Sequence, residues 1–113
     1  GIGKAILATM TDERVDEIID THGLPAATEH TITDSDALFA ELERIREENI
    51  AYDREESIEG MACLARPLSV PGPRPAAISI TGPASRVMSG ETEQKLRTYL
   101  DQAGNVIELN LKG

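Results

Sequence analysis

Residues 57–82, SIEGMACLARPLSVPGPRPAAISITG, decide the fold of this chain because they predict a β-hairpin. Two β-compatible runs flank residues 71–75, PGPRP, and neither a helix nor a central strand tolerates prolines at that density. The proline-rich segment is therefore predicted to be the turn, with one strand before it and one after it.

The two predicted strands have faces of different chemistry. Side chains alternate along a strand, so Met61, Cys63 and Ala65 share one face of the first strand. If the hairpin centres in the proline-rich turn, Cys63 lies across from Thr81, and Ala65 lies across from Ser79. This face carries small side chains, a thiol and two hydroxyls, whereas the other face is aliphatic. The pattern fits the floor of a small-molecule cavity, or a packed strand whose hydroxyls bond to backbone.

The composition limits the partners of this chain. It has 113 residues, 40% hydrophobic, and a net charge of −9 from 20 acidic and 11 basic residues. Such an acidic surface repels nucleic-acid phosphates and anionic membranes, so this chain alone is not expected to bind DNA. Its single cysteine excludes an internal disulfide framework and a cysteine-rich zinc site. No leader and no apolar run of spanning length is present, which predicts a soluble cytoplasmic protein.

Helices are predicted on both sides of the hairpin in sequence. Residues 1–10, GIGKAILATM, form a glycine-opened helix whose unpaired N–H groups could approach a carboxylate, with Lys4 adding a positive charge. A second helix is capped by Thr11 and ends at Gly23. Because the chain begins inside the first helix, we expect it to be incomplete at its N-terminus.

A third helix, a short strand and a last helix complete the prediction. Thr33 is the expected N-cap of the third helix, whose buried stripe is Leu38, Leu42 and Ile45 and whose end is Asn49. Residues 50–53 are expected to form the short strand. The last helix follows residues 82–83, is capped near Ser89, and carries one apolar stripe: Leu96, Leu100, Ala103 and Ile107, widened by Tyr99 and Val106.

Catalysis and metal binding are weak hypotheses for this chain. His30 with Glu29 provides only two potential metal ligands, so no metal site and no cofactor are expected. A cysteine-dependent enzyme would need Cys63 as nucleophile with His22 or His30 as base, and nothing in the sequence places either histidine beside Cys63. A lone buried cysteine is more often a small hydrophobe, so we expect no enzyme.

Several motifs occur in a recognisable order. GIGKAILA opens the chain, TEHT precedes the third helix, and LFAELERIR lies within it; AYDREE, GMACLARP and AAISITGP follow. Together they resemble the effector-binding domain of the IclR family of transcriptional regulators, over essentially the whole chain. The most specific part is the run D-x-E-E-x-x-x-G-x-x-C-x-A-x-P. Asn49 departs from the family, which usually has glycine there.

The resemblance implies a fold, a function and a site. The fold would be α+β and GAF-like, an antiparallel sheet flanked by helices, and residues 1–113 would be a single effector-binding domain that lacks the family's first strands. Operator DNA would be bound by a winged helix-turn-helix that these residues do not include, within a homodimer or tetramer. The helix start, Lys4 and the hydroxyl groups, rather than the resemblance, favour a small carboxylic or sugar acid as the effector. A domain for oligomerisation only, without ligand, is the alternative. The effector-binding residues carried over from the family are Gly1, Ile2, Asp53, Met61, Cys63, Ser79 and Thr81.

Overall fold

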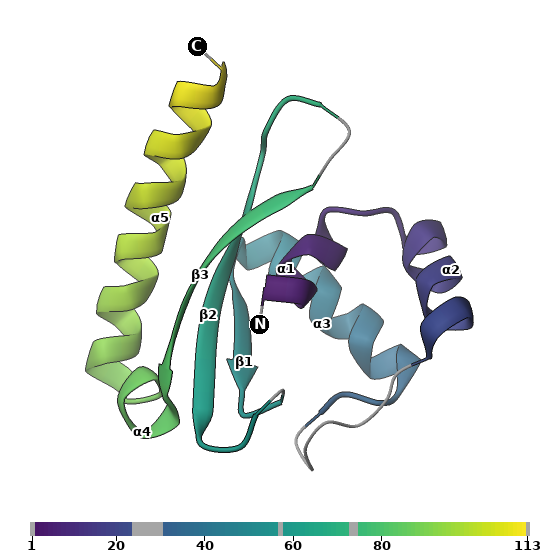
Figure 1. Ribbon diagram of the computed structural model, residues 1–113, viewed down its shortest axis with the longest axis horizontal. Helices are drawn as coiled ribbons and strands as arrows, with labels where there is room; N and C mark the ends of the chain where they lie inside the picture. The colour runs from purple at the N-terminus through teal and green to yellow at the C-terminus, as the bar shows by residue number, and fades with distance from the viewer. Residues whose placement is uncertain (1, 24–30, 57, 73–74, 113) are drawn as a thin grey trace.

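The computed structural model describes residues 2–23, 31–56, 58–72 and 75–112. Its elements are α1 (Ile2–Ala8), α2 (Asp12–His22), α3 (Ser35–Glu48), β1 (Ala51–Arg54), β2 (Met61–Leu68), β3 (Ala76–Pro83), α4 (Ala84–Val87) and α5 (Gly90–Lys112). The strands form one antiparallel sheet in the order β1-β2-β3. The long helix α5 lies on one side of this sheet, and α1 and α3 lie on the other, with α2 beyond them (Figure 1). The predicted antiparallel sheet flanked by helices is confirmed.

The predicted hairpin has the predicted register. In the pairing of β2 with β3, Cys63 is opposite Thr81 and Ala65 is opposite Ser79. The turn between the strands contains the proline-rich segment, and residues 73–74 of it lie outside the described residues. Since a shift of one residue would exchange the two faces of both strands, this register fixes which side of the sheet receives which side chains.

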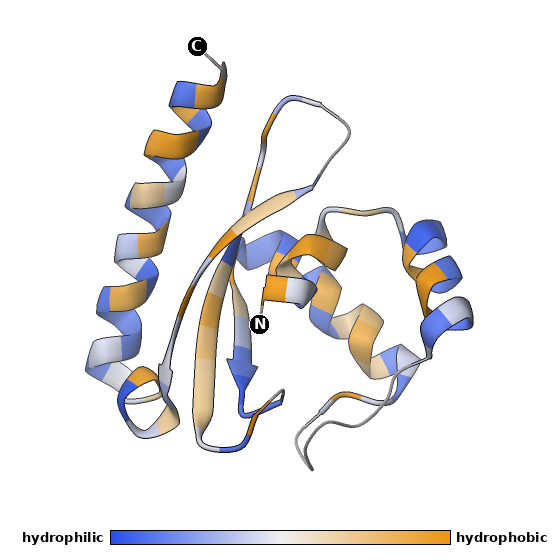
Figure 2. Ribbon diagram, viewed as in Figure 1, coloured by the Kyte–Doolittle hydropathy of each residue, from blue (hydrophilic) through white to orange (hydrophobic). Residues whose placement is uncertain are grey.

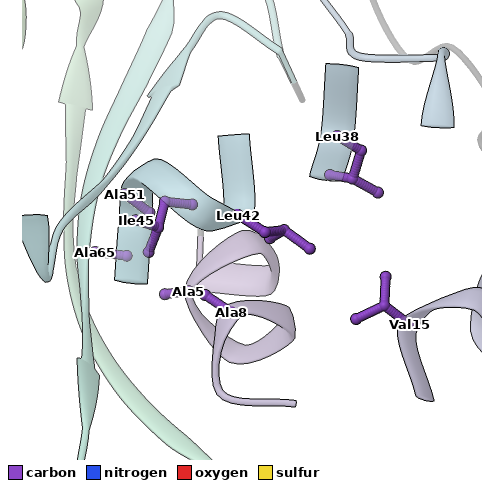
Figure 3. Close-up of a cluster of buried hydrophobic side chains, with 8 residues drawn as sticks. All are labelled: Ala5, Ala8, Val15, Leu38, Leu42, Ile45, Ala51 and Ala65. Atoms are coloured by element: carbon purple, nitrogen blue, oxygen red, sulfur yellow. The ribbon is translucent and has the colours of Figure 1, made fainter. Parts of the chain in front are cut away.

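The side of the sheet that faces α1 is built from small residues. Ala51 of β1 and Ala65 of β2 are fully buried against α1, which itself contributes Ala5 and Ala8. Alanines on both surfaces let the short helix approach the strands closely, as their proximity in Figure 3 shows. Larger side chains from α2 and α3 complete this cluster: Val15, Leu38, Leu42 and Ile45.

The opposite side of the sheet is aliphatic, as the alternation predicted. Leu64 at the centre of β2 is buried together with Ala62, Ile50, Val87 and Leu100. Half-buried Ile78 and Ile80 of β3 pack against this cluster. Figure 2 shows the long strand β2 as mostly apolar and α5 with alternating apolar and polar bands, because only its inner face meets the sheet.

The ends of α2 and α3 agree with the sequence at three of four predicted positions. The Thr11 side chain accepts a hydrogen bond from the Arg14 N–H, Gly23 ends α2 at φ 72°, and Asn49 ends α3 in the left-handed region at φ 59°. The predicted N-cap Thr33 is wrong by one residue, since the Asp34 carboxylate accepts the hydrogen bond from the Ala37 N–H. Threonine and aspartate both cap helices well, so the sequence alone did not show which of the two adjacent residues is the N-cap.

The last helix differs from the prediction in two respects. The segment after β3 first forms the short α4 and only then α5, and Tyr99 and Val106 do not widen the buried stripe because they are 65% and 58% exposed. Instead, the inner face includes Gly104, which is buried directly against Arg66 of β2. Among the helices of the described residues, none combines the length and apolar character that a membrane span requires.

Candidate functional site

A row of polar residues crosses all three strands on the α1 side of the sheet. Asp53 of β1 is paired with Cys63 of β2, and Cys63 is paired with Thr81 of β3. Ser79 follows two residues before Thr81 and therefore shares its face. The cross-strand pairing thus brings together a carboxylate, a thiol and two hydroxyls from segments up to 28 residues apart in the chain.

A pocket of about 230 Å³ lies over this row. Six of the seven residues predicted for the site line it, and the seventh, Gly1, lies outside the described residues. The described residues that line it are Ile2, Asp53, Ile58, Met61, Ala62, Cys63, Ser79 and Thr81. Sequence reasoning missed Ile58 and Ala62: Ile58 lies in the β1–β2 loop, where no periodicity applies, and Ala62 belongs by alternation to the other face.

Among the described residues of this lining, Asp53 is the only charged one, and its carboxylate is well anchored. The residue is 5% exposed, and its Oδ1 accepts a hydrogen bond of 2.8 Å from the Glu56 N–H. This bond closes the turn after β1, in which Glu55 takes a left-handed φ of 63°. The carboxylate therefore forms part of the pocket wall and also supports the turn beside it.

Lys4 was expected to bring positive charge to the ligand, and this expectation is wrong. Its ammonium does not line the pocket; it donates to the Tyr52 carbonyl oxygen and lies 2.9 Å from both carboxylate oxygens of Glu56. The side chain lies between α1, α3 and β1, where Glu41 of α3 is also 3.7 Å from the ammonium. Of the described residues in α1, Ile2 lines the pocket.

A larger hollow of about 640 Å³ lies between α1, α3 and β1, but its charged groups neutralise one another. Arg44 is bonded to Glu41 and Glu48, and Lys4 is bonded to Glu56. Partial burial by itself would raise the pKa of Glu41, but the hydrogen bond from Arg44 and the nearby charge of Lys4 bring it below its ordinary value. Such a mutually satisfied network holds elements together and leaves little charge for a ligand.

The comparison with known families decides the class of this chain. The family model described as bacterial transcriptional regulator IclR C-terminal matches residues 1–109. The chain belongs to this family.

Relatives and solved structures agree with the assignment. The HTH-type transcriptional repressor AllR of Salmonella typhi is 41% identical over 88 residues, which cover 77% of this chain and 32% of that protein. The chain therefore spans about a third of the length of such curated relatives. The crystal structure of the C-terminal domain of E. coli KdgR matches 97% of this chain and 67% of that one, with a TM-score of 0.86 and 33% identity.

A second similar structure contains a ligand. It is the inducer-binding domain of a double mutant of the PobR transcription factor from Acinetobacter, in complex with 3-hydroxybenzoic acid. It matches 95% of this chain and 62% of that chain, with a TM-score of 0.85 and 26% identity. The IclR-family fold predicted from the motifs is confirmed by these matches.

The cysteine-enzyme alternative finds no support in the geometry of this IclR-family chain. The Cys63 Sγ donates to the Leu64 carbonyl oxygen at 3.6 Å, and the described residues of the pocket lining around it include no histidine. His22 is exposed in the last turn of α2, and His30 lies outside the described residues. Within the described part of the chain, no group of three or more His, Cys, Asp or Glu residues is arranged to hold a metal.

Proposed function

We propose that this chain senses a small-molecule effector for an IclR-family transcriptional regulator. The observation that carries the proposal is the pocket over the Asp53–Cys63–Thr81 row, on the α1 side of the sheet. A domain that served only for oligomerisation would fill this space with larger aliphatic side chains, as the opposite face of the sheet does. The role is binding, and we propose no catalytic step.

The ligand we propose is a small hydroxy acid or sugar acid. The Asp53 carboxylate would accept a hydrogen bond from a ligand hydroxyl, and the Ser79 and Thr81 hydroxyls would donate to a ligand carboxylate. Ile2 and Met61 offer apolar contact beside these groups. A pocket of about 230 Å³ is below the range typical of drug-sized ligands, which favours a small compound. The bound 3-hydroxybenzoic acid of the PobR inducer-binding domain has this chemistry.

In the whole regulator, we propose that operator DNA is bound by a separate winged helix-turn-helix domain in the cytoplasm. The similar curated proteins are named HTH-type regulators, and this chain matches only about a third of their length. The charge of −9 on these 113 residues opposes contact with DNA phosphates. Sensing and DNA binding would thus be divided between separate parts of the protein.

Calorimetric titration with hydroxybenzoates, short hydroxy acids and sugar acids tests the sensing role. We expect at least one class to bind, and Ser79→Leu to weaken its affinity by about tenfold or more, because the larger side chain occupies the pocket. Ser79 is exposed within the pocket, so this variant should keep its melting temperature. Ser85→Leu in α4, also exposed, is the matched control. If wild type and Ser79→Leu bind the ligand with equal affinity, the ligand does not bind in this pocket.

We also propose that copies of this chain meet through α5 in a homodimer or tetramer. From Thr98 to Leu111, the two charged residues of this helix, Asp101 and Glu108, both pair with Arg66 of β2, and its most exposed residues are uncharged. Tyr99, Val106 and Leu109 are among them and are more than half exposed. Two copies with a charge of −9 repel each other, and an uncharged apolar surface offers the contact with least repulsion.

Sedimentation equilibrium checks this contact. Val106→Glu is expected to raise the dissociation constant between copies by about tenfold or more, since the introduced charge would be buried between them. Ala40→Glu, exposed on α3 on the other side of the sheet, adds the same charge and should leave association unchanged. A monomeric wild type, or equal effects of the two variants, would exclude α5 as the contact.

A further inference from the structure

Lys4 attaches the first turn of α1 to the strand and turn beside the pocket. Its side chain is only 12% exposed, and the Glu56 side chain with which it pairs is 16% exposed. The ammonium also donates to the Tyr52 carbonyl oxygen of β1 and lies 3.7 Å from Glu41 of α3. Ile2 and Gly3 are exposed, whereas the half-buried Lys4 and the fully buried Ala5 contact the body of the domain.

Glu56 links this ion pair to the pocket wall. Its backbone N–H donates to the Asp53 Oδ1 at 2.8 Å, and its carboxylate accepts from the Arg54 N–H at 3.1 Å while binding Lys4. Thr31 adds a hydrogen bond to the Glu56 carbonyl oxygen. Glu56 therefore bonds at the same time to the carboxylate of the pocket and to the helix that carries Ile2.

The contacts form a closed path around one side of the pocket. Asp53 lines the pocket and bonds to Glu56, Glu56 bonds to Lys4, and Lys4 belongs to the turn of α1 that places Ile2 in the same lining. Helix α1 has only seven residues, and a helix of that length is not stable by itself. Its position must come from tertiary contacts, and the Lys4 ion pair adds to the packing of the buried Ala5 and Ala8.

We infer that Lys4 and Glu56 are positioning residues of the pocket. The Lys4–Glu56 ion pair sets the distance between the start of α1 and β1, and with it the separation of Ile2 from Asp53 across the pocket. Removing one charge leaves the other partly buried without its partner, which displaces the turn. The part of this inference that concerns ligand affinity rests on the proposed sensing function; the part that concerns pocket geometry does not.

Cys63 provides a readout that needs no ligand. It is the only cysteine of the chain, it is buried, and it lines the pocket. Alkylation by iodoacetamide under native conditions therefore reports how open the pocket is. We expect Lys4→Met to raise the alkylation rate by about tenfold, since local opening requires less free energy than global unfolding. Lys4→Arg, which keeps the charge, should restore most of the protection.

Lys95→Met is the matched control. Lys95 is paired with Glu91 on the surface of α5, where both side chains are more than three-quarters exposed, so this variant removes the same charge away from the pocket. Its alkylation rate should equal that of wild type. Urea unfolding of each variant separates local from global opening: if the rate for Lys4→Met rises only as much as its global stability falls, Lys4 is merely structural and the inference is overturned. Equal rates for Lys4→Met and Lys95→Met overturn it as well.

Titration with 3-hydroxybenzoate adds a second readout. If wild type binds this probe, Lys4→Met should weaken binding by about tenfold, whereas Lys95→Met should not; equal affinities would contradict the inference. If wild type does not bind it, the choice of ligand in the proposed function is wrong for this compound. The alkylation rates then still decide whether Lys4 positions the pocket.

Discussion

Replacing Gly104 by alanine is expected to destabilise the protein, although alanine is the better helix former. A Cβ atom at this position would lie 1.9 Å from Nη1 and 2.7 Å from Cζ of Arg66. The Arg66 side chain cannot move away without loss, because it is buried between β2 and α5. Its Nη2 donates to the Asn105 Oδ1 at 2.8 Å and to Glu108 at 3.3 Å.

The two effects of the substitution can be weighed against each other. In a helix, alanine is more favourable than glycine by about 1 kcal/mol. Overpacking a tight interface costs roughly 1–3 kcal/mol, and the loss of a hydrogen bond to a charged group costs roughly 1.5–3 kcal/mol. We therefore expect Gly104→Ala to lower the free energy of unfolding by about 2 kcal/mol, as measured by urea denaturation.

A double-mutant cycle with Arg66→Ala isolates the contact. Once the guanidinium is absent, the Cβ at position 104 meets no obstacle and only the helix propensity remains. Gly104→Ala should then be neutral or stabilising by up to about 1 kcal/mol, so its effect changes sign between the two backgrounds. An equal loss of stability in both backgrounds would show that the close approach to Arg66 is not the cause.

The sheet was predictable from sequence because its pattern is local. Alternation with a period of two, together with one proline-rich turn, determined the pairing of Cys63 with Thr81 and of Ala65 with Ser79. The same alternation placed three of the polar residues on one face, and the family resemblance added Ile2 and Asp53. The pairing of Asp53 with Cys63 needed the structure, since it depends on how the loop after β1 closes.

The inner face of α5 was less predictable because it depends on a residue of another element. Arg66 lies on the β2 face that meets the helix. There the helix has Gly104, which leaves space for the guanidinium, and Asp101 and Glu108, which pair with it, instead of apolar residues. A rule based on apolar spacing predicts that those positions face solvent and that Tyr99 belongs to the buried stripe. The same limitation applied to Lys4, since its partner Glu56 follows 52 residues later and no local pattern connects them.

Replacing Leu64 by alanine tests the difference between the two faces of β2. Leu64 is almost fully buried at the centre of the aliphatic cluster, in which Ile50, Val87 and Leu100 are also buried. These neighbours are held just before β1, in α4 and in α5, so they cannot collapse into the space that the missing atoms leave. We expect the free energy of unfolding to fall by about 2–5 kcal/mol, because both the transfer free energy and the cavity contribute.

The matched control is Met61→Ala on the pocket face of the same strand. Met61 is half-buried and borders a space of about 230 Å³, so it makes fewer contacts for the substitution to remove. Its loss of stability should stay below about 1.5 kcal/mol, while binding of any ligand of the pocket should weaken. Thermal or urea unfolding of the two variants in parallel gives the comparison. If Met61→Ala destabilises as much as Leu64→Ala, the α1 side of the sheet is a filled core like the other side. The space over Asp53, Cys63 and Thr81 could then not accept an effector.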